Sequence, residues 1–188
     1  MGTTEVDRVE VDTDFWGMLV IERFDAGVRT FLKSDTELSA VIERRGPRTD
    51  KRCHLGSRDA AAVSAVVNGR GFGLDIGSGK LLKRSYRITA EVDGRFLSMR
   101  PKDIETATFV NGKPHEIEKE FGELTAKSNG TVDVAWALPK KVLNQVVDPP
   151  QPTVDDVLIG YAIAAAFGTG SLSFTTIVMG FVAAAMPG

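Results

Sequence analysis

Residues 157–188 read VLIGYAIAAAFGTGSLSFTTIVMGFVAAAMPG, and none of these 32 positions holds Asp, Glu, Lys, Arg or His. The rest of the chain carries 23 Lys or Arg and 25 Asp or Glu, for a formal net charge of −2. An uncharged run of about 18 residues or more can cross a bilayer as a helix. A helix surrounded by protein on every side has the same composition. The fold therefore depends on whether lipid or the rest of the chain covers this segment.

Small residues recur at intervals of four within the uncharged segment, and this spacing lets a helix approach a neighbour closely. The sequence predicts a hydrophobic C-terminal helix or helical hairpin over residues 154–188, because a Gly-Thr-Gly-Ser cluster divides the segment near its middle. The six residues expected to make the close helix contacts are Gly160, Ala164, Gly168, Thr176, Gly180 and Ala184.

The segments around this helix are predicted from local signals. Thr153 and Asp156 have the spacing of a capping box, which places the helix start at Val154. Three prolines in residues 148–153 predict a stiff, extended linker. Pro139 and the apolar spacing after it predict a short helix that ends the preceding domain at residue 147. The acidic residues 1–14 lack the features of a secretory signal and are expected to be flexible.

The middle of the chain, residues 15–147, has the pattern of short antiparallel strands. The dipeptides Asn68-Gly69, Asp93-Gly94, Asn111-Gly112 and Asn129-Gly130 are typical of hairpin turns. Apolar and polar residues alternate in YRITAEV (86–92) and TVDVAWALP (131–139), as they do in strands with one buried face. We therefore predict a mostly β fold, an antiparallel barrel or sandwich of about ten to twelve short strands.

This order of elements, many strands and then the apolar YAIAAAFGTGSLSFTTIVMG, resembles the tubby-like family, which includes the LURP-one-related proteins and the phospholipid scramblases. The resemblance covers roughly residues 15–180 and involves no specific motif. It implies a closed antiparallel barrel that encloses a hydrophobic C-terminal helix. It also implies binding of lipid phosphates by basic residues on the barrel.

Several kinds of chemistry find no support in the sequence. A near-neutral charge argues against a nucleic-acid partner. A single cysteine excludes an intrachain disulfide, which fits a reducing compartment. With that cysteine and two histidines the chain offers no zinc-type ligand set, and GSGK (77–80) lacks the residues of a phosphate-binding loop. We therefore expect no metal, no cofactor and no catalytic residue that can be named.

Two segments are rich in basic residues: ERRGPRTDKR (43–52) and KLLKRSYR (80–87). If they lie on the same side of the domain, they form a basic face for anionic lipid headgroups. The alternative is a solvated loop face that the acidic residues 115–123 balance. The residues predicted to contact lipid or another anion are Arg44, Arg45, Arg48, Lys51, Arg52, Lys80, Lys83, Arg84 and Arg87.

These observations favour a non-enzymatic, membrane-associated binding or scaffold protein. In this reading a β domain lies at the cytoplasmic face of a membrane, and the C-terminal segment tethers it and contributes to self-association. In the alternative reading a soluble cytoplasmic tubby-like barrel encloses the C-terminal helix and binds a lipid or another ligand. A third reading is an enzyme with a carboxylate-based site that the sequence does not locate.

Overall fold

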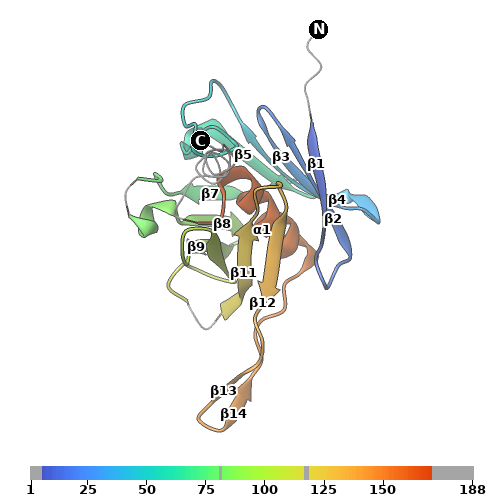
Figure 1. The fold of residues 1–188 in the computed structure, drawn as a ribbon, viewed down its shortest axis with the longest axis vertical. Helices are drawn as coiled ribbons and strands as arrows, with labels where there is room; N and C mark the ends of the chain where they lie inside the picture. The colour runs from blue at the N-terminus through green and yellow to red at the C-terminus, as the bar shows by residue number, and fades with distance from the viewer. Residues whose placement is uncertain (1–5, 81, 117–118, 171–188) are drawn as a thin grey trace, which may run out of the picture.

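The computed structural model describes residues 6–80, 82–116 and 119–170. Within them the fold is mostly antiparallel β with one C-terminal α-helix (Figure 1). The first sheet contains β1 (Asp7–Asp12), β2 (Met18–Phe24), β3 (Gly27–Leu32), β4 (Asp35–Arg44), β5 (Val63–Val67) and β6 (Arg70–Gly71). The second contains β7 (Gly73–Ile76), β8 (Ile88–Val92), β9 (Arg95–Pro101), β10 (Thr106–Val110), β11 (Glu120–Ala126) and β12 (Val132–Trp136).

Each sheet is a meander in which neighbours in sequence are neighbours in space. The order is β1-β2-β3-β4-β5-β6 in one sheet and β12-β11-β10-β9-β8-β7 in the other. The chain passes from the first sheet to the second at Phe72, between β6 and β7. In the described part of the chain the strands form separate sheets and do not close into a hydrogen-bonded barrel.

Two of the predicted Asx-Gly turns have positive φ angles at both turn residues, as expected for these residue types. Asn68 and Gly69 have φ values of 48° and 77° between β5 and β6, and Asp93 and Gly94 have 50° and 79° between β8 and β9. Asn, Asp and Gly tolerate positive φ, and two such residues in succession match the right-handed twist of the flanking strands. These turns therefore set the register of both hairpins.

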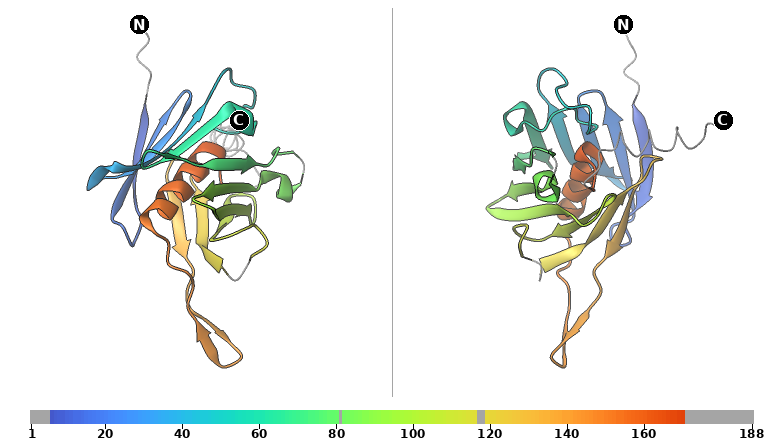
Figure 2. Two further views of the ribbon diagram at one scale, coloured as in Figure 1. Left: turned by 180° about the vertical axis from the view of Figure 1, so that it is seen from behind. Right: turned by 60° about the vertical axis from the view of Figure 1, so that its left-hand side comes forward.

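The α-helix α1 (Val154–Phe167) lies between the two sheets and forms the centre of the core (Figure 2). Leu158, Tyr161 and Phe167 are among its largest buried side chains, each at most 2% exposed. The hydroxyl of Thr30, on β3, donates a 2.8 Å hydrogen bond to the carbonyl of Leu158. Protein therefore covers residues 154–167, and the expectation that the whole C-terminal segment stands apart from the strands as a tether is wrong for this part.

The two ends of α1 fit local sequence signals. Thr153 is the N-cap, and its side chain and that of Asp156 form the predicted capping box. Arg95 pairs with the buried Asp156 at 2.6 Å, which balances the charge at this end. Beyond Phe167, Gly168 has a φ of 82° and ends the helix. The predicted helix start at Val154 is therefore confirmed.

Two other local predictions are wrong. Residues 140–147 form a hairpin, β13 (Lys140–Val142) and β14 (Gln145–Val147), where a short helix was predicted. Leu143 and Asn144 have φ values of 45° and 66°, which make a tight turn that a helix cannot contain. Residues 7–12, expected to be flexible, are strand β1, because they pair along the edge of β2.

Gly160 marks a close approach between α1 and the second sheet. A Cβ atom at this position would lie 2.9 Å from the ring of Phe109, on β10. Ala164 is buried, and its carbonyl accepts a 2.8 Å hydrogen bond from the amide of Gly168. Thr176, Gly180 and Ala184 lie outside the described residues. Among the helices that the structure describes, none combines the length and apolar character required to cross a bilayer.

Candidate anion-binding surface

The two basic segments lie side by side, although residues 53–79 separate them in the sequence. Arg52 donates to the carbonyl of Gly79 at 2.5 Å, and Arg58 donates to the carbonyl of Gly77 at 2.9 Å. Arg58 also lies over the rings of Tyr86 and Phe167, with its guanidinium carbon 5.2 and 5.7 Å from their centroids. The loop after β4 is therefore joined to the loop between β7 and β8.

Arg44 is not part of the exposed surface, contrary to the sequence-based prediction. Its side chain is 5% exposed and donates to the carbonyls of Leu55, Gly46 and Asp25. It also pairs with the carboxylate of Asp25 at 3.3 Å. Arg44 therefore stabilises the loop after β4 through these buried hydrogen bonds.

The other eight predicted residues are exposed, and we call them the basic surface: Arg45, Arg48, Lys51, Arg52, Lys80, Lys83, Arg84 and Arg87. Arg52 is balanced by Asp50 at 2.8 Å, and this hydrogen bond lowers the pKa of the Asp50 carboxyl. Lys80, Arg84 and Arg87, by contrast, form no ion pair with any carboxylate in the described ranges. Positive charge therefore remains uncompensated in residues 80–87.

Two exposed apolar side chains border the basic surface. Leu82 and Ile104 are each 54% exposed. Their loops are joined by Lys83, whose ammonium group donates a 2.8 Å hydrogen bond to the carbonyl of Lys102. Leu82 lies among cations in the sequence, which is typical of segments that lie in a membrane interface, whereas the sequence neighbours of Ile104 are acidic. Neither residue was predicted, although Ile104 is an apolar residue between Asp103 and Glu105 and Leu82 directly precedes Lys83 and Arg84.

The described chain ends at the same end of the molecule. The amide of Leu55 donates to the carbonyl of Ala166 at 2.9 Å, so the loop after β4 covers the C-terminal end of α1. The hydroxyl of Thr169 hydrogen-bonds to the carbonyl of Glu105, and the backbone of Gly170 lies directly against Ile104. The uncharged residues 171–188 therefore follow from a point beside Ile104.

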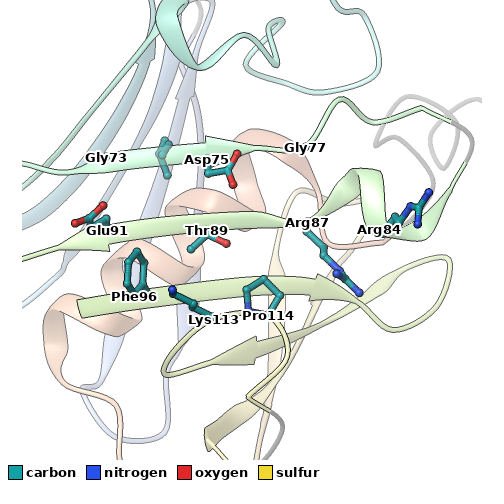
Figure 3. Close-up of a pocket in the computed structure, with 11 residues that line it drawn as sticks. Gly73, Asp75, Gly77, Arg84, Arg87, Thr89, Glu91, Phe96, Lys113 and Pro114 are labelled. Atoms are coloured by element: carbon teal, nitrogen blue, oxygen red, sulfur yellow. The ribbon is translucent and has the colours of Figure 1, made fainter. Parts of the chain in front are cut away.

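A pocket of about 580 Å³ adjoins the basic surface on the outer face of the second sheet. Figure 3 shows Arg84 and Arg87 toward one end of this pocket and Glu91 with Phe96 toward the other. Lys113 and the hydroxyl-bearing Thr89 lie between these ends. Guanidinium groups are strong partners for phosphate oxygens, so the arginine end suits a phosphate-bearing group.

The cysteine and its neighbouring histidine are not arranged for nucleophilic catalysis. Cys53 is 2% exposed, and burial raises the pKa of its thiol. Burial lowers the pKa of His54, whose Nε2 lies 3.1 Å from the carbonyl of Phe24 and 3.3 Å from that of Gly27. A buried thiol that keeps its proton is a weak nucleophile. In the ranges that the structure describes, no cluster of His, Cys, Asp or Glu could hold a metal ion.

Comparison with known proteins found no matching family model, no matching curated protein and no matching solved structure.

Proposed function

We propose that this chain is a non-enzymatic binding protein that associates with anionic membranes through the basic surface. Leu82 and Ile104 insert at the interface, while the surrounding lysines and arginines contact lipid phosphates. In this proposal the membrane-directed part of the C-terminal segment is residues 171–188, and α1 serves as the core. The protein would then lie at the cytoplasmic face of a membrane.

The observation that carries the proposal is the exposure of Leu82 among Lys80, Lys83 and Arg84, at the end of the molecule where the described chain stops. Ile104, between Asp103 and Glu105, adds exposed apolar surface at the same end. Each Lys or Arg close to an anionic bilayer contributes on the order of 1 kcal/mol to binding. Apolar contacts add a contribution that salt does not screen. Charge and apolar surface at the same end of the molecule would act together on one bilayer.

The alternative is a soluble tubby-like protein that binds a phosphate-bearing ligand in the pocket of Figure 3. The helix between two sheets and the arginine end of the pocket favour this reading. Both readings assign phosphate contacts to Arg84 and Arg87. They differ in whether the phosphate belongs to a membrane lipid or to a soluble ligand.

The test is co-sedimentation of the full chain with vesicles of phosphatidylcholine alone or with phosphatidylserine. Lys80→Gln with Arg84→Gln removes two charges from the basic surface, and neither side chain makes an ion pair with a described residue. We expect binding to the anionic vesicles to fall by about tenfold or more, since each charge contributes on the order of 1 kcal/mol.

The matched control is Lys33→Gln with Lys119→Gln, which removes the same charge from exposed sites whose partners are Glu10 and Glu116. This control should retain binding. Equal loss in both double variants, or equal binding of the unaltered chain to neutral and anionic vesicles, would refute the proposal. Binding of soluble inositol phosphate without vesicle binding would favour the alternative.

A further inference from the structure

One side of the molecule has an open seam between the two sheets. β1 and β12 are each the last strand of their sheet, so each has one edge without a strand partner in the described chain. Side chains bridge the seam near its two ends. Arg23 donates to the carbonyl of Gly130 at 2.6 Å, and the indole N–H of Trp136 donates to the carbonyl of Thr13 at 3.0 Å. Such open edges are sites where another strand can pair.

The seam contains an acidic groove of about 380 Å³. Four carboxylates line it: Glu10, Asp12, Asp14 and Asp133. Glu10 pairs with Lys33 at 2.7 Å and Asp133 with Lys127 at 3.2 Å. Asp12 and Asp14 form no ion pair with a cation in the described part of the chain. The groove therefore favours a cationic occupant.

A pocket of about 380 Å³, lined mainly by aromatic and proline side chains and also by Asp148 and Gln151, lies next to the groove. The rings of Phe15 and Trp136 lie 5.3 Å apart, centroid to centroid, and both line the pocket. Pro139, Pro149 and Pro150 complete much of its wall. This pocket suits an aliphatic side chain, and it lies at the base of the β13–β14 hairpin.

The β13–β14 hairpin projects from the body of the molecule (Figure 1). Leu143 at its turn is 96% exposed, and Val146 is 68% exposed. Lys140 and Lys141 add two positive charges, and the contact of Lys140 with Glu120 is long, at 3.7 Å. A two-stranded hairpin is marginally stable by itself in water. A protein surface that covers this hairpin would stabilise it.

We propose that the hairpin binds the seam of a second copy of this chain, and that the second copy returns the same contact. The hairpin is cationic and apolar, and the seam of the same chain is acidic with the aromatic and proline-lined pocket beside it. Since the hairpin leaves the body next to that pocket, a two-fold axis near Pro139 brings each hairpin to the other copy's seam. This is a self-complementary interface, the commonest kind in homodimers.

The first test is sedimentation velocity of the full chain over the micromolar range, without lipid. We expect a dimer. Leu143→Asp should weaken dimerisation by about tenfold or more, as is typical of a central interface residue. The change should leave the fold intact, because the side chain is almost fully exposed. Leu82→Asp, which alters an exposed leucine outside this interface, is the matched control and should remain dimeric.

The second test exchanges charge between the two surfaces. One variant carries Lys140→Glu and Lys141→Glu, and the other carries Asp12→Lys and Asp133→Lys. Each alone should be monomeric, because like charges then face one another in both contacts. A mixture should form a heterodimer, because each hairpin then meets a seam of opposite sign. A monomeric unaltered chain, a dimer that survives Leu143→Asp, or a mixture that stays monomeric would overturn the proposal.

Discussion

Tyr161 places a polar hydroxyl group inside the apolar core. It is 1% exposed, and its hydroxyl has no partner among the described residues. Burial raises its pKa well above the ordinary value of 10, and the nearby charges of Asp14, Asp133 and Asp12 act in the same direction. The hydroxyl therefore lies near the acidic side of the molecule and remains protonated in the folded state.

Tyr161→Phe should change stability little at neutral pH, because no hydrogen bond to a described group is lost. Above about pH 10 the unfolded tyrosine loses its proton while the folded one keeps it, so the unaltered protein loses stability as pH rises. The Phe variant lacks this contribution. Urea denaturation at neutral pH and above pH 10 should show the variant gaining stability relative to the unaltered protein at the higher pH. A constant difference at both values would contradict the burial argument.

Gly160 tests how closely α1 and β10 approach. Leucine at this position would collide with the Phe109 ring, which is itself held against Phe121 at a centroid separation of 5.2 Å. We expect Gly160→Leu to lower the free energy of unfolding by about 1–3 kcal/mol, the usual cost of overpacking. Gly73→Leu is the control, since a Cβ atom there would lie 3.9 Å from its nearest neighbour. Equal urea midpoints for the two variants would show that the helix can move away.

At the scale of elements, α1 is the core that both sheets share. A chain ending at Pro150 would lack this helix and expose the inner faces of both sheets. We expect that truncation to aggregate or to lose cooperative unfolding, whereas a chain ending at Gly170 keeps α1, its capping box and the Thr169 contacts. Circular dichroism and thermal unfolding of both chains would check this. A folded, monomeric 1–150 chain would show that the sheets do not need the helix.

The elements that the sequence predicted correctly are those with a local cause. Asn68-Gly69 and Asp93-Gly94 form turns because their backbone tolerates positive φ, and Thr153 caps α1 through its own side chain. Residues 139–147 are too short for their apolar spacing to distinguish a helix from a hairpin. The environment of α1 was also undetermined, because a helix that is apolar on every side has the same sequence in lipid and in a protein core.

The basic surface could likewise be predicted from the sequence only in part. Its charges are visible in the sequence, but the contact that joins its two segments depends on Arg52 and Gly79, which lie far apart along the chain. Strand alternation puts Arg44 in phase with the buried Ala40 and Ile42 and Arg45 out of phase, but the carbonyls that accept from Arg44 cannot be identified from the local sequence. They include the carbonyls of Leu55 and Asp25, toward which β4 turns Arg44.

At the scale of the whole molecule, the proposed functions use opposite ends. The basic surface adjoins the C-terminal end of α1, where Arg58 reaches the carbonyl of Phe167. The β13–β14 hairpin precedes the N-terminal end of the helix. A dimer formed through the hairpins would therefore leave both basic surfaces uncovered, so dimerisation and membrane binding would not compete.

Salt should separate the two contributions to membrane binding that the proposal combines. Binding through exposed charges weakens as the Debye length falls from about 8 Å at physiological salt to about 3 Å at 1 M. Apolar insertion is not screened in this way. We therefore expect a chain ending at Gly170, which keeps Leu82 and Ile104 as its only proposed apolar contacts, to leave anionic vesicles at a lower salt concentration than the full chain, which also keeps the uncharged residues 171–188. Co-sedimentation across a salt series measures both. If the two chains leave the vesicles at the same salt concentration, residues 171–188 contribute nothing to membrane association, and the basic surface with Leu82 and Ile104 must account for the binding.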